Sequence, residues 1–169
     1  MHIILSILTA LMMLNPETPE DWNMDRVWNS CTDEQRMELP YEYQARACGI
    51  DPDEFIYLAK VVEAESDRSS NLQPKVMIAA CILNRVDSSY FRDTIRGVLD
   101  EPGQFTTTSG GECYINSTQT SRWAIVEAQR QRRDGLIPKN VLFFNCIGYN
   151  YGTPYGVYGD NYFMTYGDE

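Results

Sequence analysis

Two glutamates near the end of one predicted helix are the side chains best suited to acid–base chemistry in this sequence. The stretch that begins at Asp51 predicts a helix, because Asp51 suits the N-cap and Pro52 the first helical position. At about 100° per residue, Glu65 falls on the apolar face of this helix, whereas Glu63 falls on the other side. The apolar residues of that face are Phe55, Leu58, Val61 and Val62.

The position of Glu65 suggests a general acid. A carboxyl group held against apolar side chains resists ionisation, so its pKa rises. A glutamate that keeps its proton near neutral pH can donate that proton to a substrate. The same helix pattern also fits a Glu65 that bends out to water or pairs with Arg68 or Arg85, and the pattern alone leaves these alternatives open.

The remaining segments predict a mainly helical α+β domain. The helix expected over residues 74–86 is apolar on nearly every side, which predicts that it forms the centre of the core. Further helices are expected over residues 32–47 with an interruption near Leu39 at Pro40, after Asp93, and over residues 118–133. Residues 142–144 are typical of a strand.

Two segments allow a structural or a functional interpretation. Residues 103–117 are rich in Gly, Ser and Thr, and they are expected to form either a functional loop or a pair of strands. The tail from residue 149 to 169 is rich in tyrosine and glycine. Its rings either pack as a small β-hairpin on the helices or present exposed faces that suit sugar rings.

Charge and composition exclude several functions. The 169 residues carry a formal net charge of −10, which argues against a nucleic-acid partner, because phosphates need Lys and Arg. The single histidine is His2, so the rest of the chain offers no Ser-His-Asp or Cys-His catalysis and no usual zinc site. We therefore expect no metal and no cofactor.

The five cysteines form no CxxC motif. Cys81 lies in the apolar helix and is expected to be a buried free thiol. In an exported protein the other cysteines could form two bridges, for which Cys31–Cys48 and Cys113–Cys146 are the choices closest in sequence. Sequence does not fix this connectivity.

Three parts are expected along the chain. Residues 1–15 are an apolar leader, shorter than the roughly 20 residues of a membrane-spanning helix and similar in length to the apolar part of a signal peptide. A terminal helix packed on the domain is the alternative for this leader. Residues 16–50 form an acidic segment, irregular at first and then helical, and residues 51–169 form the main domain. We expect export, and no stable membrane insertion of the mature domain.

Four ordered motifs resemble one enzyme family. Ala64-Glu65, the triplet at residues 84–86, the short helix at residues 94–98 and the turn at residues 102–105 occur at close spacing. Together they resemble the catalytic domain of spore cortex-lytic enzymes and cell-wall hydrolases. The resemblance implies a lysozyme-like helical core with a small β part near the C-terminus. It also implies that Glu65 is the catalytic residue.

The resemblance further implies a set of substrate-binding residues, and it shows departures from the family pattern. Cys146, Asn161 and Glu63 differ from the residues that are common in the family at these positions. The implied substrate-binding residues are Asn84, Gln104, Phe105, Thr106 and Asn145.

The expected activity is cleavage of peptidoglycan glycan strands between N-acetylmuramic acid, or muramic lactam, and N-acetylglucosamine. A lytic transglycosylase would leave 1,6-anhydromuramic ends with Glu65 as its only acid. The alternatives are a hydrolytic muramidase with a second carboxylate, and a non-catalytic peptidoglycan-binding module that uses the tyrosine-rich tail. We expect a monomer exported to the cell wall or spore cortex, or a phage lysin. The candidates for the second carboxylate are Asp67, Asp100, Glu101 and Glu112.

Overall fold

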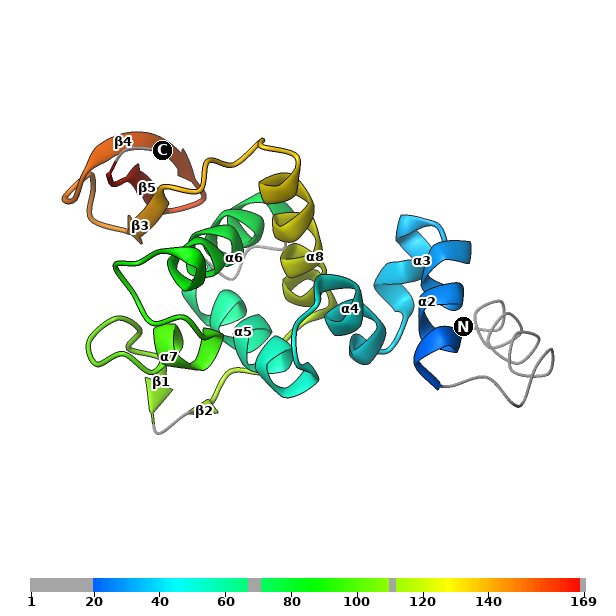
Figure 1. Cartoon of the computed structure of the whole chain (residues 1–169). Coiled ribbons are helices and arrows are strands. Elements are labelled where there is room, and N and C mark those ends of the chain that lie inside the picture. Colours follow the sequence, from blue (N-terminus) through cyan, green and yellow to red (C-terminus); the bar gives the residue numbers. More distant parts are fainter. Residues whose placement is uncertain (1–19, 67–70, 110–111, 168–169) are drawn as a thin grey trace. The chain divides into compact units, whose positions relative to one another are not determined.

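The computed structural model describes residues 20–66, 71–109 and 112–167 (Figure 1). The chain divides into two compact units, Met1–Pro52 and Asp53–Glu169. The leader expected over residues 1–15 lies outside the described residues. In the described ranges, no helix is long and apolar enough to cross a membrane.

The described part of the first unit contains three short helices: α2 (Glu20–Ser30), α3 (Asp33–Glu38) and α4 (Tyr41–Cys48). Thr32 caps α3 with a capping box. The helical structure is interrupted at Leu39 and Pro40, as the sequence predicts. The expectation of an irregular start to this segment is wrong, because α2 is helical. Val27 of α2 is buried with Cys31 and Leu39. Tertiary packing therefore stabilises a helix that its own few apolar residues do not predict.

The two central helices of the second unit follow the sequence prediction closely. Helix α5 (Pro52–Glu65) begins at Pro52, and its four predicted core residues are fully buried. Helix α6 (Leu72–Asp87) is buried at every position from Pro74 to Arg85. It contacts α7 (Ile95–Leu99), α8 (Gln119–Arg133) and the sheet, which confirms that α6 is the centre of the core.

Capping residues fix the ends of the other helices. Helix α7 is capped by Thr94, whose hydroxyl accepts a hydrogen bond from the backbone N–H of Gly97, and not by Asp93. Helix α8 is capped by Thr118 in a reciprocal arrangement with Ser121.

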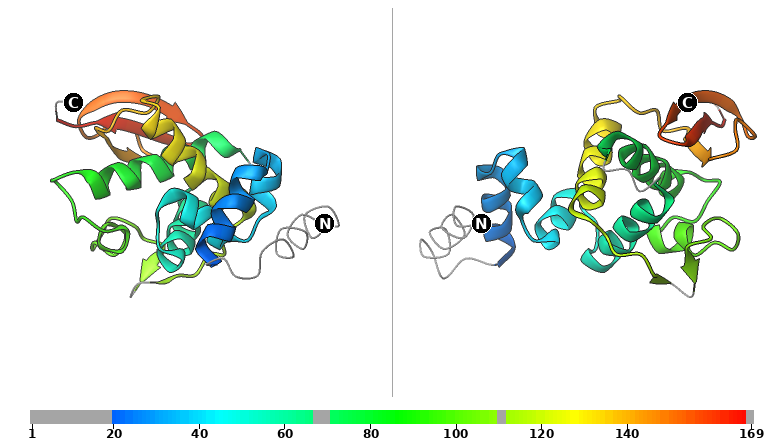
Figure 2. Two further views of the ribbon diagram at one scale, coloured as in Figure 1. Left: turned by 45° about the vertical axis from the view of Figure 1, so that its right-hand side comes forward. Right: turned by 180° about the vertical axis from the view of Figure 1, so that it is seen from behind.

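The strands lie on two sides of α6 (Figures 1 and 2). On one side, β1 (Thr108–Ser109) pairs with β2 (Glu112–Cys113), so the polar loop does contain a strand pair. On the other side, β3 (Val141–Asn145), β4 (Thr153–Tyr158) and β5 (Asn161–Thr165) form an antiparallel sheet in the order β3-β5-β4. The small β part expected near the C-terminus is this sheet.

All five cysteines are free thiols, so neither of the two bridges closest in sequence forms. Cys31 is buried in the core of the first unit with Val27 and Leu39. Cys113 is buried in β2, whereas Cys146 is exposed just after β3. Burial raises the pKa of the Cys81 thiol to about 11, so this thiol stays protonated at neutral pH, as expected for a core residue.

Candidate active site

Glu65 is the last residue of α5, and its carboxyl group is half-buried. Thr107, which precedes β1, donates a hydrogen bond from its hydroxyl to Glu65 Oε1 at 2.9 Å. Burial raises the pKa of Glu65, and the Thr107 hydrogen bond and the charge of Arg85 oppose this rise. The result is a carboxyl group that holds its proton more strongly than an exposed glutamate does.

The backbone of Glu65 is tied to the sheet. Asn161, the first residue of β5, is 7% exposed and donates from Nδ2 to the carbonyl oxygen of Glu65 at 3.2 Å. The last carbonyl groups of a helix have no partner within the helix. Asn161 therefore supplies a partner at the end of α5 and links that end to the sheet.

Arg85 lies in a cage of aromatic rings close to this site. Its guanidinium carbon is 5.1 to 5.8 Å from the centroids of four phenylalanine rings, and the residue is only 4% exposed. Arg85 Nε donates to the carbonyl of Leu142 at 2.7 Å, and Nη1 donates to Gln104 Oε1 at 3.2 Å. Arg85 thus connects α6, β3 and the polar loop. The four rings belong to Phe91, Phe105, Phe143 and Phe144.

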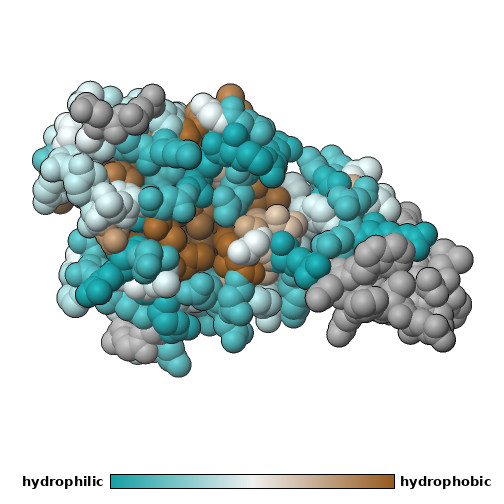
Figure 3. All heavy atoms as spheres, viewed as in Figure 1, coloured by the Kyte–Doolittle hydropathy of each residue, from teal (hydrophilic) through white to brown (hydrophobic). Residues whose placement is uncertain are grey.

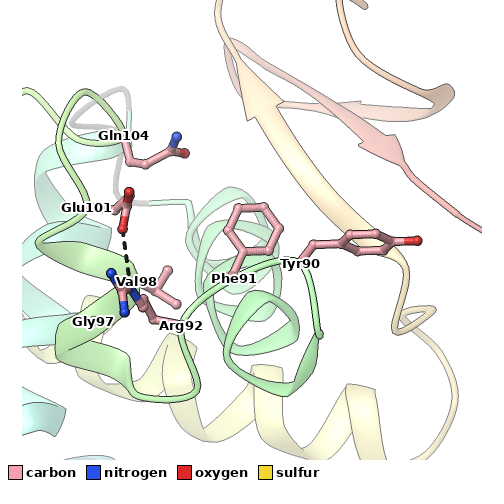
Figure 4. A pocket seen from close by; sticks show the side chains of 7 residues that line it. All are labelled: Tyr90, Phe91, Arg92, Gly97, Val98, Glu101 and Gln104. Atoms are coloured by element: carbon pink, nitrogen blue, oxygen red, sulfur yellow. Dashed lines mark ion pairs between the residues drawn. The ribbon is translucent and has the colours of Figure 1, made fainter.

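A pocket of about 360 Å³ opens beside Gln104 (Figure 4). The exposed side chain of Gln104 lies on one side of the pocket, and the rings of Phe91 and Tyr90 lie on the other. At its base, Arg92 Nε is 3.8 Å from Glu101 Oε2, a loose pair of two exposed side chains. The pocket therefore combines aromatic surface with an amide, a cation and a carboxylate. Gly97 and Val98 complete its lining.

Further aromatic surface is exposed on the sheet. Tyr151 stacks on Phe143 with 5.5 Å between ring centroids, and Tyr166 meets Tyr90 edge to face at 5.3 Å. Tyr90, Tyr151 and Tyr166 are nevertheless exposed. The tail is thus a hairpin that packs one set of rings and exposes another. Figure 3 also shows apolar atoms between hydrophilic margins in the middle of the second unit.

Glu63 has different partners from Glu65. Lys75 Nζ of α6 lies 3.1 Å from Glu63 Oε2, and the Thr118 hydroxyl donates to the same oxygen at 2.7 Å. The two glutamates of one helical turn are therefore engaged by separate sets of groups, as the helix pattern predicts.

Known proteins resemble this chain in sequence and in structure. A sequence profile described as Cell Wall Hydrolase matches residues 69–155, just over half of the 169 residues. The chain belongs to the cell wall hydrolase family. The resemblance stated from the four motifs is confirmed.

Curated relatives of this cell wall hydrolase are spore cortex-lytic enzymes. The enzyme from Bacillus cereus is 35% identical over 80 residues, which cover 47% of this chain and 30% of that protein. The enzyme from Bacillus subtilis strain 168 is 35% identical over 80 residues, which are 26% of its length. The chain therefore spans about a third or less of the length of the curated relatives it matches.

Two solved structures share the fold. The catalytic domain of Bacillus cereus SleB superposes with a TM-score of 0.57 at 27% identity, covering 68% of this chain and 91% of that domain. The catalytic domain of a germination-specific lytic transglycosylase, SleB from Bacillus anthracis, gives the same TM-score and identity and is covered over 98%. The lysozyme-like α+β fold class that the resemblance implies is thereby confirmed.

Two residues implied as glycan contacts are placed inside the hydrolase. Asn84 is 1% exposed; its Nδ2 donates to the carbonyls of Pro138 and Val141, and its Oδ1 accepts from Arg132. All its polar atoms are engaged by the protein, so it joins α6 to α8 and β3 and offers nothing to a ligand. Phe105 is 5% exposed and packs under Arg85.

The other implied contacts remain accessible in different degrees. Gln104 lines the pocket, and Thr106 is exposed in the loop between Phe105 and Thr107. Asn145 is half-buried, and its Oδ1 accepts hydrogen bonds from the backbone N–H groups of Ile147 and Gly148, which shapes the turn after β3. The structure thus brings Gln104 to the pocket and gives Asn145 a turn-forming role.

Sequence reasoning did not select Thr107 and Asn161, the two residues that hold Glu65. Thr107 directly follows Thr106 in the same polar loop. The composition of this loop indicates a functional region, but it does not single out Thr107 within it. Asn161 stands out in the sequence only as a departure from the family pattern. Among the residues that the structure describes, no cluster of three or more His, Cys, Asp or Glu could hold a metal ion.

Proposed function

We propose that this cell wall hydrolase cleaves the glycan strands of peptidoglycan, with Glu65 as its single general acid and base. The observation that carries the proposal is the half-buried Glu65 carboxyl group, whose pKa is raised by burial and which Thr107 orients. Membership of the family and the names of the relatives support peptidoglycan as the substrate.

The reaction we propose needs one acid and no water. Glu65 donates its proton to the glycosidic oxygen, and the bond between that oxygen and C1 of the muramic acid breaks. The C6 hydroxyl of the same sugar then bonds to C1, and its proton passes to Glu65, which regenerates the acid. The product is a 1,6-anhydromuramic end. Because the nucleophile is already tethered to the reacting sugar, positioning contributes much of the rate.

Hydrolysis is the second candidate, and it requires a further carboxylate about 5 to 9.5 Å from the acid. Of the candidates for this role, Asp100 accepts a hydrogen bond from the Tyr57 hydroxyl at 2.6 Å, and Glu101 pairs loosely with Arg92. Glu112 lies exposed in β2, and Asp67 lies outside the described residues. In the structure, Asp100 and Glu101 are thus engaged by other side chains. This favours the single-acid reaction.

We further propose that the pocket beside Gln104 binds a sugar of the glycan strand. A sugar ring offers an apolar face to Tyr90 and Phe91 and hydroxyl or acetamido groups to Gln104. Replacing Gln104 by Ala should weaken glycan affinity and turnover by roughly 10-fold, the loss of about one hydrogen bond in a partly buried site. Unchanged affinity and turnover in folded Gln104→Ala protein would remove this residue from the binding site.

The place of action follows from the substrate. We propose that the protein acts as a monomer outside the cytoplasm, in the cell wall, the spore cortex or, if it is encoded by a phage, during lysis. A non-catalytic peptidoglycan-binding module would use the same exposed rings without turnover.

Mass spectrometry of peptidoglycan digested by the full chain separates the three functions. The lytic reaction predicts anhydromuropeptides, and hydrolysis predicts reducing muramic ends. If the protein instead sediments with peptidoglycan that stays intact and undigested, only the function of a non-catalytic binding module remains.

A further inference from the structure

The residues on both sides of Ala64-Glu65 are held by one buried lysine. Lys75 Nζ, which pairs with Glu63 at 3.1 Å, also donates to the hydroxyl of Ser66 at 2.6 Å. Lys75 is 1% exposed, and Ser66 is 6% exposed. We call the group formed by Glu63, Ser66, Lys75 and Thr118 the Lys75 clamp.

The Lys75 clamp also closes the end of α5. The backbone N–H of Ser66 donates to the carbonyl of Val62 at 3.2 Å, and the Ser66 hydroxyl donates to the carbonyl of Glu63 at 2.9 Å. Since the last carbonyls of a helix lack intrahelical partners, a helix end without such bonds frays. Lys75 fixes the hydroxyl that makes one of these bonds, and Thr118 fixes the side chain of Glu63.

A stabilising role alone is a weak explanation for an ion pair whose lysine is buried and whose glutamate is mostly buried. Taking an ammonium and a carboxylate out of water costs much of what their attraction returns, and apolar replacements of whole buried pairs are often neutral for stability. A general acid, by contrast, must be held within a fraction of an ångström of its productive position. The clamp grips the two neighbours of Ala64-Glu65, while Asn161 holds the Glu65 carbonyl from the sheet.

We propose that Lys75 is a positioning residue for Glu65, acting through Glu63 and Ser66; this inference rests on the proposed function of Glu65. Lys75 itself touches neither Glu65 nor the substrate in this role. Its task is to fix the last turn of α5, so that the Glu65 carboxyl group meets the glycosidic oxygen at a constant place.

Two variants of the full chain test the role. Ser66→Ala removes the hydroxyl that links Lys75 to the helix end, and the double variant Glu63→Gln/Lys75→Met removes both charges together. In folded protein, kcat on purified peptidoglycan should fall roughly 10- to 100-fold, while KM stays within about 2-fold, because the acid is misplaced and glycan contacts are kept. The buried variant Ile125→Val, about two turns along α8 from Thr118, is the destabilised control and should keep its kcat.

The outcomes separate positioning from stability. Unchanged kcat in folded Ser66→Ala protein overturns the proposal, even if the double variant fails to fold. A fall in kcat no larger than that of Ile125→Val, once each is corrected for its folded fraction, also overturns it.

A second readout does not depend on turnover. NMR titration of the Glu65 carboxyl carbon should give a lower pKa in Ser66→Ala than in the wild type, because a released carboxyl group moves toward water; identical titrations contradict positioning. If wild-type protein is inactive, or if Glu65→Gln protein is as active as the wild type, the proposed function fails, and the titration still decides the role of the clamp.

Discussion

Glu63 and Glu65, two chemically identical side chains in the last turn of α5, lie in different surroundings. On one side, Glu63 meets the ammonium of Lys75 and the hydroxyl of Thr118. On the other, Glu65 is half-buried and meets the Thr107 hydroxyl, with Arg85 acting only through its charge. The difference teaches that a contacting cation makes a glutamate a structural link, whereas burial with a neutral donor raises the pKa of a glutamate, as the proton donor that we propose requires.

The largest expected effect comes from removing Arg85, the cation on the Glu65 side, and it concerns the free energy of unfolding. Arg85→Leu leaves the Leu142 carbonyl and the Gln104 amide oxygen without their donor and replaces the cation inside the aromatic cage. An unpaired buried carbonyl such as that of Leu142 costs about 1–3 kcal/mol, whereas the exposed Gln104 can bond to water, so we expect a loss of about this size in the free energy of unfolding. Urea unfolding measures this loss. A midpoint equal to that of the wild type would contradict the linking role of Arg85.

A smaller effect is expected from Thr107→Val, which keeps the shape of the side chain and removes its hydroxyl. The Thr107 hydrogen bond lowers the pKa of Glu65, so its loss should raise that pKa further. The alkaline limb of the kcat/KM profile should move to higher pH, because the free enzyme keeps its acid protonated over a wider range. Thr106→Val, one residue earlier and exposed, is the matched control. An alkaline limb that does not move would show that Thr107 does not act on the acid.

The smallest effect concerns stability. A carboxyl group whose folded pKa is raised contributes most to stability below its ordinary pKa of 4.5, and this contribution is lost as the pH rises through the folded pKa. Glutamine cannot ionise, so Glu65→Gln should be more heat-resistant than the wild type at pH 7, with the difference fading below pH 4.5. Melting curves across this range test the sign. A Glu65→Gln protein that melts earlier at pH 7 would indicate that ionised Glu65 is stabilised by the fold.

Local patterns predict much of this fold. The start of α5 follows from the Asp51-Pro52 sequence, and the buried centre of α6 follows from its uninterrupted apolar residues. Helix α2 was missed, because few apolar residues mark it and packing around Val27 stabilises it. Neither of the two bridges closest in sequence is present, and the sequence alone leaves this pairing open.

The candidate site also has one part that the sequence predicts and another that it does not. The helix face selects Glu65, but its partners come from far along the chain: Thr107 is 42 residues away and Asn161 is 96 residues away. Local sequence patterns do not predict contacts between residues so far apart in the chain. The same limit explains Asn84, whose place at the end of a predicted helix suggested a cleft, although residues more than 50 positions away bury it.

The replacement of Glu65 by Gln tests the central claim most directly. The change keeps size and shape but removes the proton, so folding and glycan binding should stay near the wild type. Release of muropeptides from purified peptidoglycan should fall by at least the roughly 10²–10⁴-fold typical of losing a general acid or base. Glu63→Gln is the matched control, and because its amide oxygen can still accept from Lys75 and Thr118, turnover should fall far less. Near-normal release of muropeptides by folded Glu65→Gln protein would contradict the assignment of Glu65 and the single-acid reaction.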